Sequence, residues 1–188
     1  EPHVKDCALM EVKILSPNIN SSHPSFIVNN NDEIEYGLGA LKDVGRKFIE
    51  EVCAERANGR FTSLMDFASR VDLRKGGIRS LKSMAKAGAF DEICSRDEAV
   101  SSVKSYLEAS EQKFKSKESA VMEMFAEQSD LKVSGFKLET FSESEKLKME
   151  LESFGFYYSK HPVTLLRKTL SSRIQPISKL MTTTNEKY

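Results

Sequence analysis

Residues 36–47 read YGLGALKDVGRK, and this stretch decides the kind of fold that we predict. Before it the apolar residues alternate as they do in strands, whereas from Phe48 to Cys53 they recur with the period of a helix. The change of period, with glycines at the junction, predicts a short first helix, a tight turn at 43–45 and a second helix that starts at Arg46. We expect glycine to be required in the turn.

This arrangement is typical of a helix-hairpin-helix unit, in which the turn aims backbone N–H groups at an anion beside the N-terminus of the second helix. Because that end of a helix favours negative charge, such a unit can hold a DNA phosphate without contacting any base. Cations beside the turn would add to the attraction. The candidate DNA-binding residues of this first unit are Lys42, Val44, Gly45, Arg46 and Lys47.

A second candidate unit occupies residues 72–79, which read DLRKGGIR. It lies between a short helix, opened by the capping pair Ser63 and Asp66, and a helix that ends at Gly88. Two units in tandem would hold a duplex with an affinity that is independent of sequence and falls with added salt. The alternative is that the glycines only end helices and the cations form a solvated surface. The candidate DNA-binding residues here are Lys75, Gly76, Gly77, Arg79 and Lys82.

The rest of the chain predicts a mainly α fold with a small amino-terminal β-hairpin element. The predicted hairpin strands are residues 25–28 and 33–36, with the turn-forming sequence NNND between them. A capping pair at Ser95 and Glu98 opens a longer helix, whose apolar face fades near Ser110. The predicted regions are a β and loop element at 1–36, tandem helix-hairpin-helix units at 37–91, a long helix at 92–118, an extended or mobile segment at 119–142, and a last region at 143–188 with helices at 143–153 and 162–170.

Composition limits what this 188-residue chain can do. Its 28 basic side chains equal its 28 acidic ones, so any contact with DNA must come from a local patch and not from the overall charge. Three distant cysteines fit neither a disulfide framework nor a zinc site, which favours a reducing, cytoplasmic location. No apolar run is long enough to span a membrane. No catalytic set is apparent either, so we expect no catalytic residue, no metal and no cofactor.

Five motifs occur along the chain in a definite order. They are LSPNIN at 15–20, YGLGALKDVG at 36–45, FTSLMDFASRVD at 61–72, AGAFD at 87–91 and LESFGFYYSKHP at 151–162. Together they resemble the alpha subunit of bacterial DNA polymerase III. The resemblance implies a fragment of a DNA-directed DNA polymerase, which starts without an initiator methionine and leads toward an OB-type domain. In that family the palm aspartates and the metal-binding residues lie upstream of these motifs, so we expect no active site here.

Three residues depart from the pattern that is common in the family. Asp43 stands where a glycine is common, Asn18 where an aspartate is common, and Gly77 where an asparagine is common. The first of these matters most, because a carboxylate beside a phosphate-binding turn repels the phosphate. We expect the first unit to bind DNA more weakly than its relatives do.

The resemblance also implies a sliding-clamp-binding peptide after the long helix, which usually begins with glutamine and ends in large apolar residues. Within 119–142 the segment VMEMF fits by position, with Met124 and Phe125 as anchors that would fill a pocket on the clamp. Val121 replaces the usual glutamine, so we expect a lower affinity. The alternatives are the segment QSDL at 128–131 and a single turn of a core-packed helix. The candidate clamp-binding residues are Val121, Met122, Glu123, Met124 and Phe125.

The sequence therefore predicts a non-catalytic part of a replicative polymerase that binds duplex DNA and the sliding clamp. The rest of the polymerase III holoenzyme would be its further partner, and we expect no contact with a membrane. The alternative, from a different class, is a helical scaffold that binds only protein and has no affinity for DNA.

Overall fold

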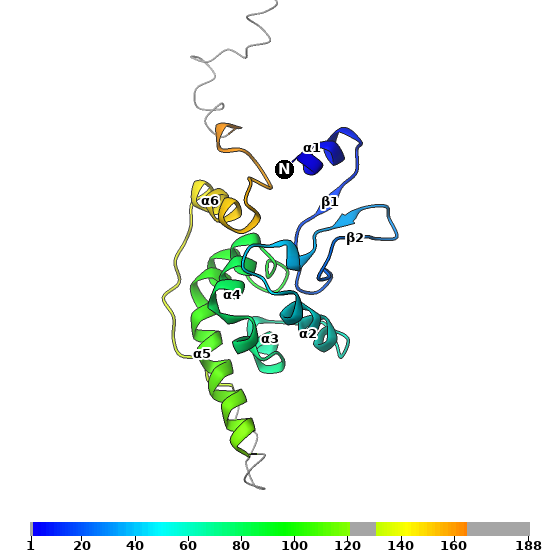
Figure 1. Cartoon of the computed structure of the whole chain (residues 1–188). Coiled ribbons are helices and arrows are strands. Elements are labelled where there is room, and N and C mark those ends of the chain that lie inside the picture. The colour runs from blue at the N-terminus through cyan, green and yellow to red at the C-terminus, as the bar shows by residue number, and fades with distance from the viewer. Residues whose placement is uncertain (1, 121–130, 165–188) are drawn as a thin grey trace, which may run out of the picture.

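The computed structural model describes residues 2–120 and 131–164. This part of the chain is mainly helical, with a small three-stranded sheet near the N-terminus, so the predicted fold class is confirmed (Figure 1). The elements in chain order are α1 (Pro2–Leu9), β1 (Ile14–Leu15), β2 (Ile27–Val28), β3 (Ile34–Glu35), η1 (Leu38–Ala40), α2 (Arg46–Arg56), α3 (Leu64–Arg70), η2 (Leu73–Lys75), α4 (Gly77–Ala87), α5 (Arg96–Ala120) and α6 (Glu143–Phe154), where η denotes a 3-10 helix.

The sheet has the strand order β1-β3-β2. Strands β2 and β3 pair antiparallel, as the predicted hairpin requires, and β1 adds to β3 in parallel. In the hairpin turn the Asn29 side chain accepts the N–H groups of Asn31 at 2.9 Å and Glu33 at 3.0 Å. Asp32 adopts a positive φ of 58° there. Asn and Asp tolerate these conformations, which explains the polar sequence of this turn.

The prediction of only β and loop structure at 1–36 is wrong at its beginning, because α1 occupies residues 2–9. Pro2 suits a first helical position, where no N–H is needed for the ladder. The helix has only eight residues, and its sequence PHVKDCAL repeats no apolar face. A helix this short gives little period to detect, whereas the alternation around Val12 is typical of a strand.

Helix α4 lies at the centre of the helical part and packs against both α5 and α6, while α3 and η2 also pack against α5. The buried ring of Phe67 contacts those of Phe61 and Phe90, at centroid distances of 5.2 and 5.4 Å. Buried Ser110 joins α5 to the loop before η2, because its hydroxyl accepts the Leu73 N–H at 3.2 Å and donates to the Val71 carbonyl at 3.3 Å. The helices therefore form one continuous core.

Helix α5 is the longest element and extends past the other helices in Figure 1. Among its residues 96–116, whose burial the structure describes, the last buried one is Ser110, which agrees with the predicted loss of the apolar face. The helix nevertheless continues to Ala120, two residues beyond the predicted end. Ion pairs four residues apart, such as Lys115 with Glu111 at 3.4 Å, accompany this exposed part. Residues 131–142 form no helix or strand.

Helix α6 brings the chain back to the amino-terminal part of the molecule. It starts at a capping box formed by Ser142 and Glu145 and ends at Gly155, whose φ is 83°. Its last residue, Phe154, lies 5.0 Å edge-on from the ring of Tyr36 and stacks on Tyr158 at 4.8 Å. The segment after α6 thus packs against the first predicted unit, more than 100 positions earlier in the sequence.

Candidate nucleic-acid interface

The first hairpin connects η1 to α2, and α2 starts at Arg46 as predicted. Its turn, however, does not require glycine at Gly45. That residue has φ −76°, and a Cβ placed on it would meet nothing within 4 Å. The left-handed position is Asp43 instead, with φ 61°. Aspartate can adopt this conformation, but glycine adopts it with less strain, which gives a backbone reason for a glycine at position 43.

Part of the backbone in the first hairpin is already hydrogen-bonded within the protein. The Lys42 N–H donates to the Ser153 carbonyl at 2.9 Å, and the Val44 N–H donates to the Leu41 carbonyl at 3.3 Å. The N–H groups that remain for an anion are those of the first turn of α2, which have no acceptor inside the helix. No side chain caps this end of α2.

The second hairpin connects α3 through η2 to α4, and its two glycines have different tasks. Gly76 has φ −82°, but a Cβ on it would lie 2.6 Å from the ring of Phe48. Gly76 therefore permits close packing of α2 against the start of α4. Gly77 has φ 69° and open space around it, so it makes the turn. The start of α4, like that of α2, has no side-chain cap.

The uncapped starts of α2 and α4 contrast with those of three other helices. The side chains of Ser63, Ser95 and Ser142 accept backbone N–H groups at the starts of α3, α5 and α6, at 3.1, 3.2 and 3.3 Å. A serine cap satisfies one of the free N–H groups of a helix and so competes with an external anion. Among these five helices, the two that follow the predicted hairpins are the ones left open.

Not every predicted cation is available to DNA. Arg46 pairs with Glu50 at 2.9 Å and Lys75 pairs with Glu51 at 2.8 Å. The hydrogen bond from Lys75 to Glu51 also raises the pKa of this lysine. The ammonium of Lys42 lies at the C-terminal end of α6, where a helix favours positive charge; a Cβ on the Gly155 backbone there would be 3.5 Å from its Nζ.

Three other predicted cations face solvent without an acidic partner. Lys47 on α2, and Arg79 and Lys82 on α4, are exposed, and none of them makes an ion pair with any residue in the described ranges 2–120 and 131–164. Arg79 and Lys82 stand one turn apart on the same helix, directly after its uncapped start. They are the strongest candidates for contacts with phosphate.

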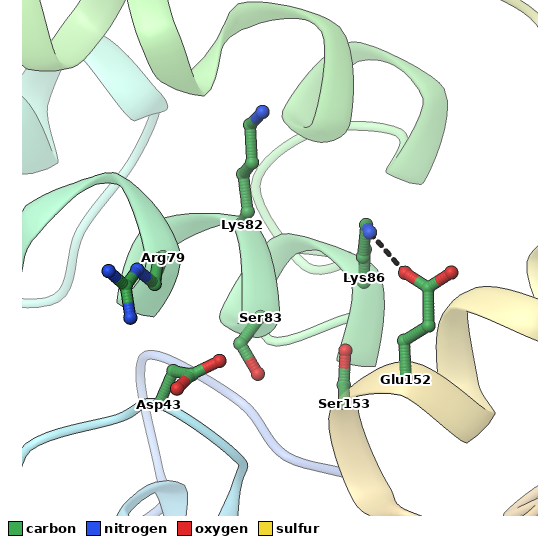
Figure 2. Close-up of a pocket in the computed structure, with 7 residues that line it drawn as sticks. All are labelled: Asp43, Arg79, Lys82, Ser83, Lys86, Glu152 and Ser153. Carbon is green, nitrogen blue, oxygen red and sulfur yellow. Dashed lines mark hydrogen bonds and ion pairs between the residues drawn. The ribbon is translucent and has the colours of Figure 1, made fainter.

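The two hairpins meet at a pocket of about 200 Å³ that Figure 2 shows in close-up. Asp43 enters it from the first hairpin, while Arg79 and Lys82 come from the second. Lys86, which pairs with Glu152 of α6, completes one side. The pocket is lined by Asp43, Arg79, Lys82, Ser83, Lys86, Glu152 and Ser153.

Four residues of this pocket were not predicted from the sequence: Ser83, Lys86, Glu152 and Ser153. Lys86 continues the row of Arg79 and Lys82 at the spacing of one helical turn, so the signal for it was present in the sequence. Nothing in the sequence near α4 indicated Glu152 or Ser153, because only the return of α6 brings them to this surface.

The candidate clamp-binding residues Val121, Met122, Glu123, Met124 and Phe125 lie outside the described residues. So do the first three residues of the alternative segment 128–131. Its last residue, Leu131, is half-buried and packs against the hydrophobic core. A leucine used in this way is not free to anchor a clamp, which favours the first of the two segments.

The cysteines Cys53 and Cys94 are half-buried, and we find no metal-binding cluster among the described residues. Burial raises the pKa of the Cys94 thiol to about 12 and also raises that of Cys53, which keeps both thiols protonated and unreactive. Within residues 2–120 and 131–164 no three His, Cys, Asp or Glu side chains gather in a way that could hold a metal ion. In the same ranges no helix combines the length and apolar character needed to cross a membrane.

The two hairpins, each followed by an open helix start, are typical of helix-hairpin-helix motifs. The family described as "Helix-hairpin-helix motif" matches residues 11–99, which include both hairpins. Beyond this class, the chain is homologous to a segment of the bacterial DNA polymerase III alpha subunit that covers its helix-hairpin-helix region. The resemblance predicted from the five motifs is thereby confirmed.

Three relatives show the extent of this homology. The chain is 35% identical over 172 residues to DNA polymerase III subunit alpha of Haemophilus influenzae, with 88% of this chain and 15% of the relative covered. It is 29% identical over 182 residues to that of Pseudomonas aeruginosa, with 85% and 16% covered. For Chlamydia pneumoniae the identity is 34% over 176 residues, with 89% and 14% covered. The chain spans about 15% of the length of these relatives.

Proposed function

We propose that this chain holds duplex DNA without reading its sequence, as a cytoplasmic part of a replicative DNA polymerase that works with the rest of the holoenzyme. The observation that carries the proposal is the pair of uncapped helix starts at α2 and α4, each directly after a hairpin. Open N–H groups at the positive end of a helix bind phosphate oxygens and ignore the bases.

The charge distribution supports the same function. The chain as a whole is neutral, so attraction to DNA has to come from a patch. Arg79 and Lys82 provide one on α4, and Lys47 adds a third exposed cation on α2. Each cation that neutralises a phosphate releases a counterion, so the affinity should fall steeply as salt is added.

The test is binding of a fluorescent duplex, measured by anisotropy at low salt. We expect Arg79→Glu with Lys82→Glu to weaken binding by at least about tenfold, because two attractive contacts become repulsive. The matched control is Lys104→Glu with Lys115→Glu, two exposed lysines on α5, which should leave binding nearly unchanged. If the unmodified chain shows no duplex affinity even at low salt, the scaffold alternative is correct instead.

We also propose that residues 121–125 bind the sliding clamp. The support is the sequence of this segment and its position after α5, together with the burial of Leu131 in the competing segment. Such a peptide would act as a tether, because a weak contact is sufficient when the polymerase is already held near the clamp. We expect micromolar binding, on the order of 8 kcal/mol at most.

Surface plasmon resonance on immobilised clamp tests this second proposal. Met124→Ala with Phe125→Ala should abolish binding, since both anchors are lost. The control is Phe136→Ala with Leu138→Ala, which removes two exposed apolar side chains from the neighbouring segment 131–142. Equal clamp binding by the two double variants would contradict the assignment.

A further inference from the structure

The pocket between α4 and α6 contains two polar groups that the protein leaves unused. Ser83 on α4 is 6% exposed and Ser153 on α6 is 1% exposed, and both line the pocket. Neither hydroxyl has a hydrogen-bond partner in the described part of the chain. Figure 2 shows these two side chains and Asp43 converging from three different elements. A buried hydroxyl without a partner is unfavourable, so two of them in one pocket indicate a ligand that accepts hydrogen bonds.

The charges around the pocket identify the kind of ligand. Arg79, Lys82 and Lys86 bring three positive charges, against two negative charges from Asp43 and Glu152. Glu152 is engaged by Lys86 in an ion pair, whereas Arg79 and Lys82 have no acidic partner among the described residues. The net charge at the pocket is therefore positive. Hydroxyl donors together with long cationic side chains are suited to an anion with several oxygens.

We propose that this pocket binds a phosphate group. The Ser83 and Ser153 hydroxyls donate to phosphate oxygens, and Arg79, Lys82 and Lys86 supply the countercharge. The site shares Asp43 and Arg79 with the two hairpins, but it adds the Ser83 and Ser153 hydroxyls from the middle of α4 and the end of α6 and relies on no backbone N–H group of a helix N-terminus. Asp43 and Glu152 oppose the anion and so set the affinity of the site.

The phosphate has two possible sources, a backbone phosphate of bound duplex or a free phosphate compound. The first source rests on the proposed DNA-binding function, whereas the second does not. Two probes distinguish these sources when the same variants are measured at equal ionic strength. Binding of inorganic pyrophosphate is measured by isothermal titration calorimetry, and binding of a fluorescent duplex is measured by anisotropy.

The matched pair of variants is Ser83→Ala and Ser80→Ala. Both serines are buried on α4 and both hydroxyls lack a partner, but only Ser83 lines the pocket. We expect Ser83→Ala to weaken binding of the phosphate ligand by roughly tenfold, because it removes a hydrogen bond to a charged group. Ser80→Ala should leave the affinity unchanged. Thermal melting checks the fold, and Ser83→Ala removes no hydrogen bond of the protein itself.

A second variant tests the charge argument on an exposed residue, Glu152, whose side chain pairs with Lys86. Glu152→Gln removes one opposing carboxylate, so binding should become roughly twofold to fivefold tighter. If Ser83→Ala lowers thermal stability, the affinity of the Glu152→Gln variant for the phosphate ligand remains as the test of the proposed site.

The outcomes separate the possibilities. If the Ser83→Ala variant binds both probes, or the duplex alone, more weakly than the unmodified chain does, the pocket contacts a backbone phosphate. Weaker binding of pyrophosphate alone supports the pocket with a free phosphate ligand and leaves the duplex function to the hairpins. Equal effects of Ser83→Ala and Ser80→Ala on both probes, or no tightening by Glu152→Gln, would overturn the proposal.

Discussion

At the scale of single residues, the glycines of the two hairpins differ in what a side chain at their positions would meet. Gly45 has an ordinary φ and open space, whereas Gly76 faces the ring of Phe48. We expect Gly45→Ala to change the free energy of unfolding by less than about 1 kcal/mol. Gly76→Ala should cost about 1–3 kcal/mol, because the ring must move. Urea denaturation of both variants checks this, and equal stability of the two would contradict it.

The residues of the candidate site were only partly predictable from the sequence, because contacts between distant segments decide which of them are paired. A cation beside a glycine turn is visible in the sequence, but its partner is not. Lys75 is paired with Glu51, and the Lys42 ammonium lies beside Gly155 at the end of α6, in both cases through the approach of distant segments. Arg79 and Lys82 remained free because no acidic side chain of the described residues reaches them. The fold, not the local pattern, decides which predicted cations are available.

At the scale of elements, helix starts were predicted well where they follow the serine capping pattern. Ser63 and Ser95 act as caps as predicted, and Gly88 ends α4 with φ 84°. Where a helix has no capping residue, its start was predicted from the point at which the apolar residues begin to recur with helical spacing, and this prediction is correct for α2 at Arg46. Helix α1 has neither signal and was missed. The predicted helix at 162–170 begins at residue 162, and its part beyond 164 lies outside the described residues.

The carboxyl group that caps η2 should make the stability of the second hairpin sensitive to acid. Asp72 caps η2, and its hydrogen bond from the Arg74 side chain lowers the pKa of this carboxyl below its usual range. A carboxyl with a lowered pKa in the folded state stabilises the fold above its unfolded pKa, and this contribution is lost as the pH falls through the lowered value.

We therefore expect the melting temperature to drop as the pH falls from about 5 to about 3, in the range where carboxyls titrate. Glu92, whose pKa is lowered by a hydrogen bond from Arg60, contributes in the same direction. Asp72→Asn keeps an oxygen that can cap η2 but cannot titrate, so the drop should be smaller in this variant. Melting curves across this pH range provide the measurement, and an unchanged pH dependence in the variant would refute the linkage.

At the scale of the whole molecule, the return of α6 closes the structure over the first hairpin. Phe154 is 8% exposed and packs between the rings of Tyr36 and Tyr158. The Tyr158 hydroxyl in turn donates to the Ile14 carbonyl of the sheet at 3.0 Å. Helix α6 and the residues that follow it as far as Tyr158 are thus part of the same folded unit as the hairpins, although they lie beyond residues 11–99 of the family match.

Because α6 packs against the first hairpin, we expect a residue of α6 to have a large effect on the free energy of unfolding, although it is far from either hairpin in the sequence. Phe154→Ala should lower the free energy of unfolding by about 3–5 kcal/mol, since it leaves a cavity among aromatic rings. Leu151, on the same helix, is 37% exposed, and Leu151→Ala should cost less than about 1 kcal/mol. Chemical denaturation distinguishes them, and a small effect of Phe154→Ala would mean that α6 is not part of the folded unit.

If exposed cations on α4 hold DNA phosphates, as we propose, the affinity for duplex must depend on salt through these cations. The measurement is the slope of the logarithm of the association constant against the logarithm of salt concentration, for the unmodified chain and for Arg79→Ala with Lys82→Ala. Each phosphate contact that is lost should reduce the slope by about 1. We expect the slope to be shallower by about 2 in the double variant, whereas an unchanged slope would mean that these two cations do not contact DNA phosphates.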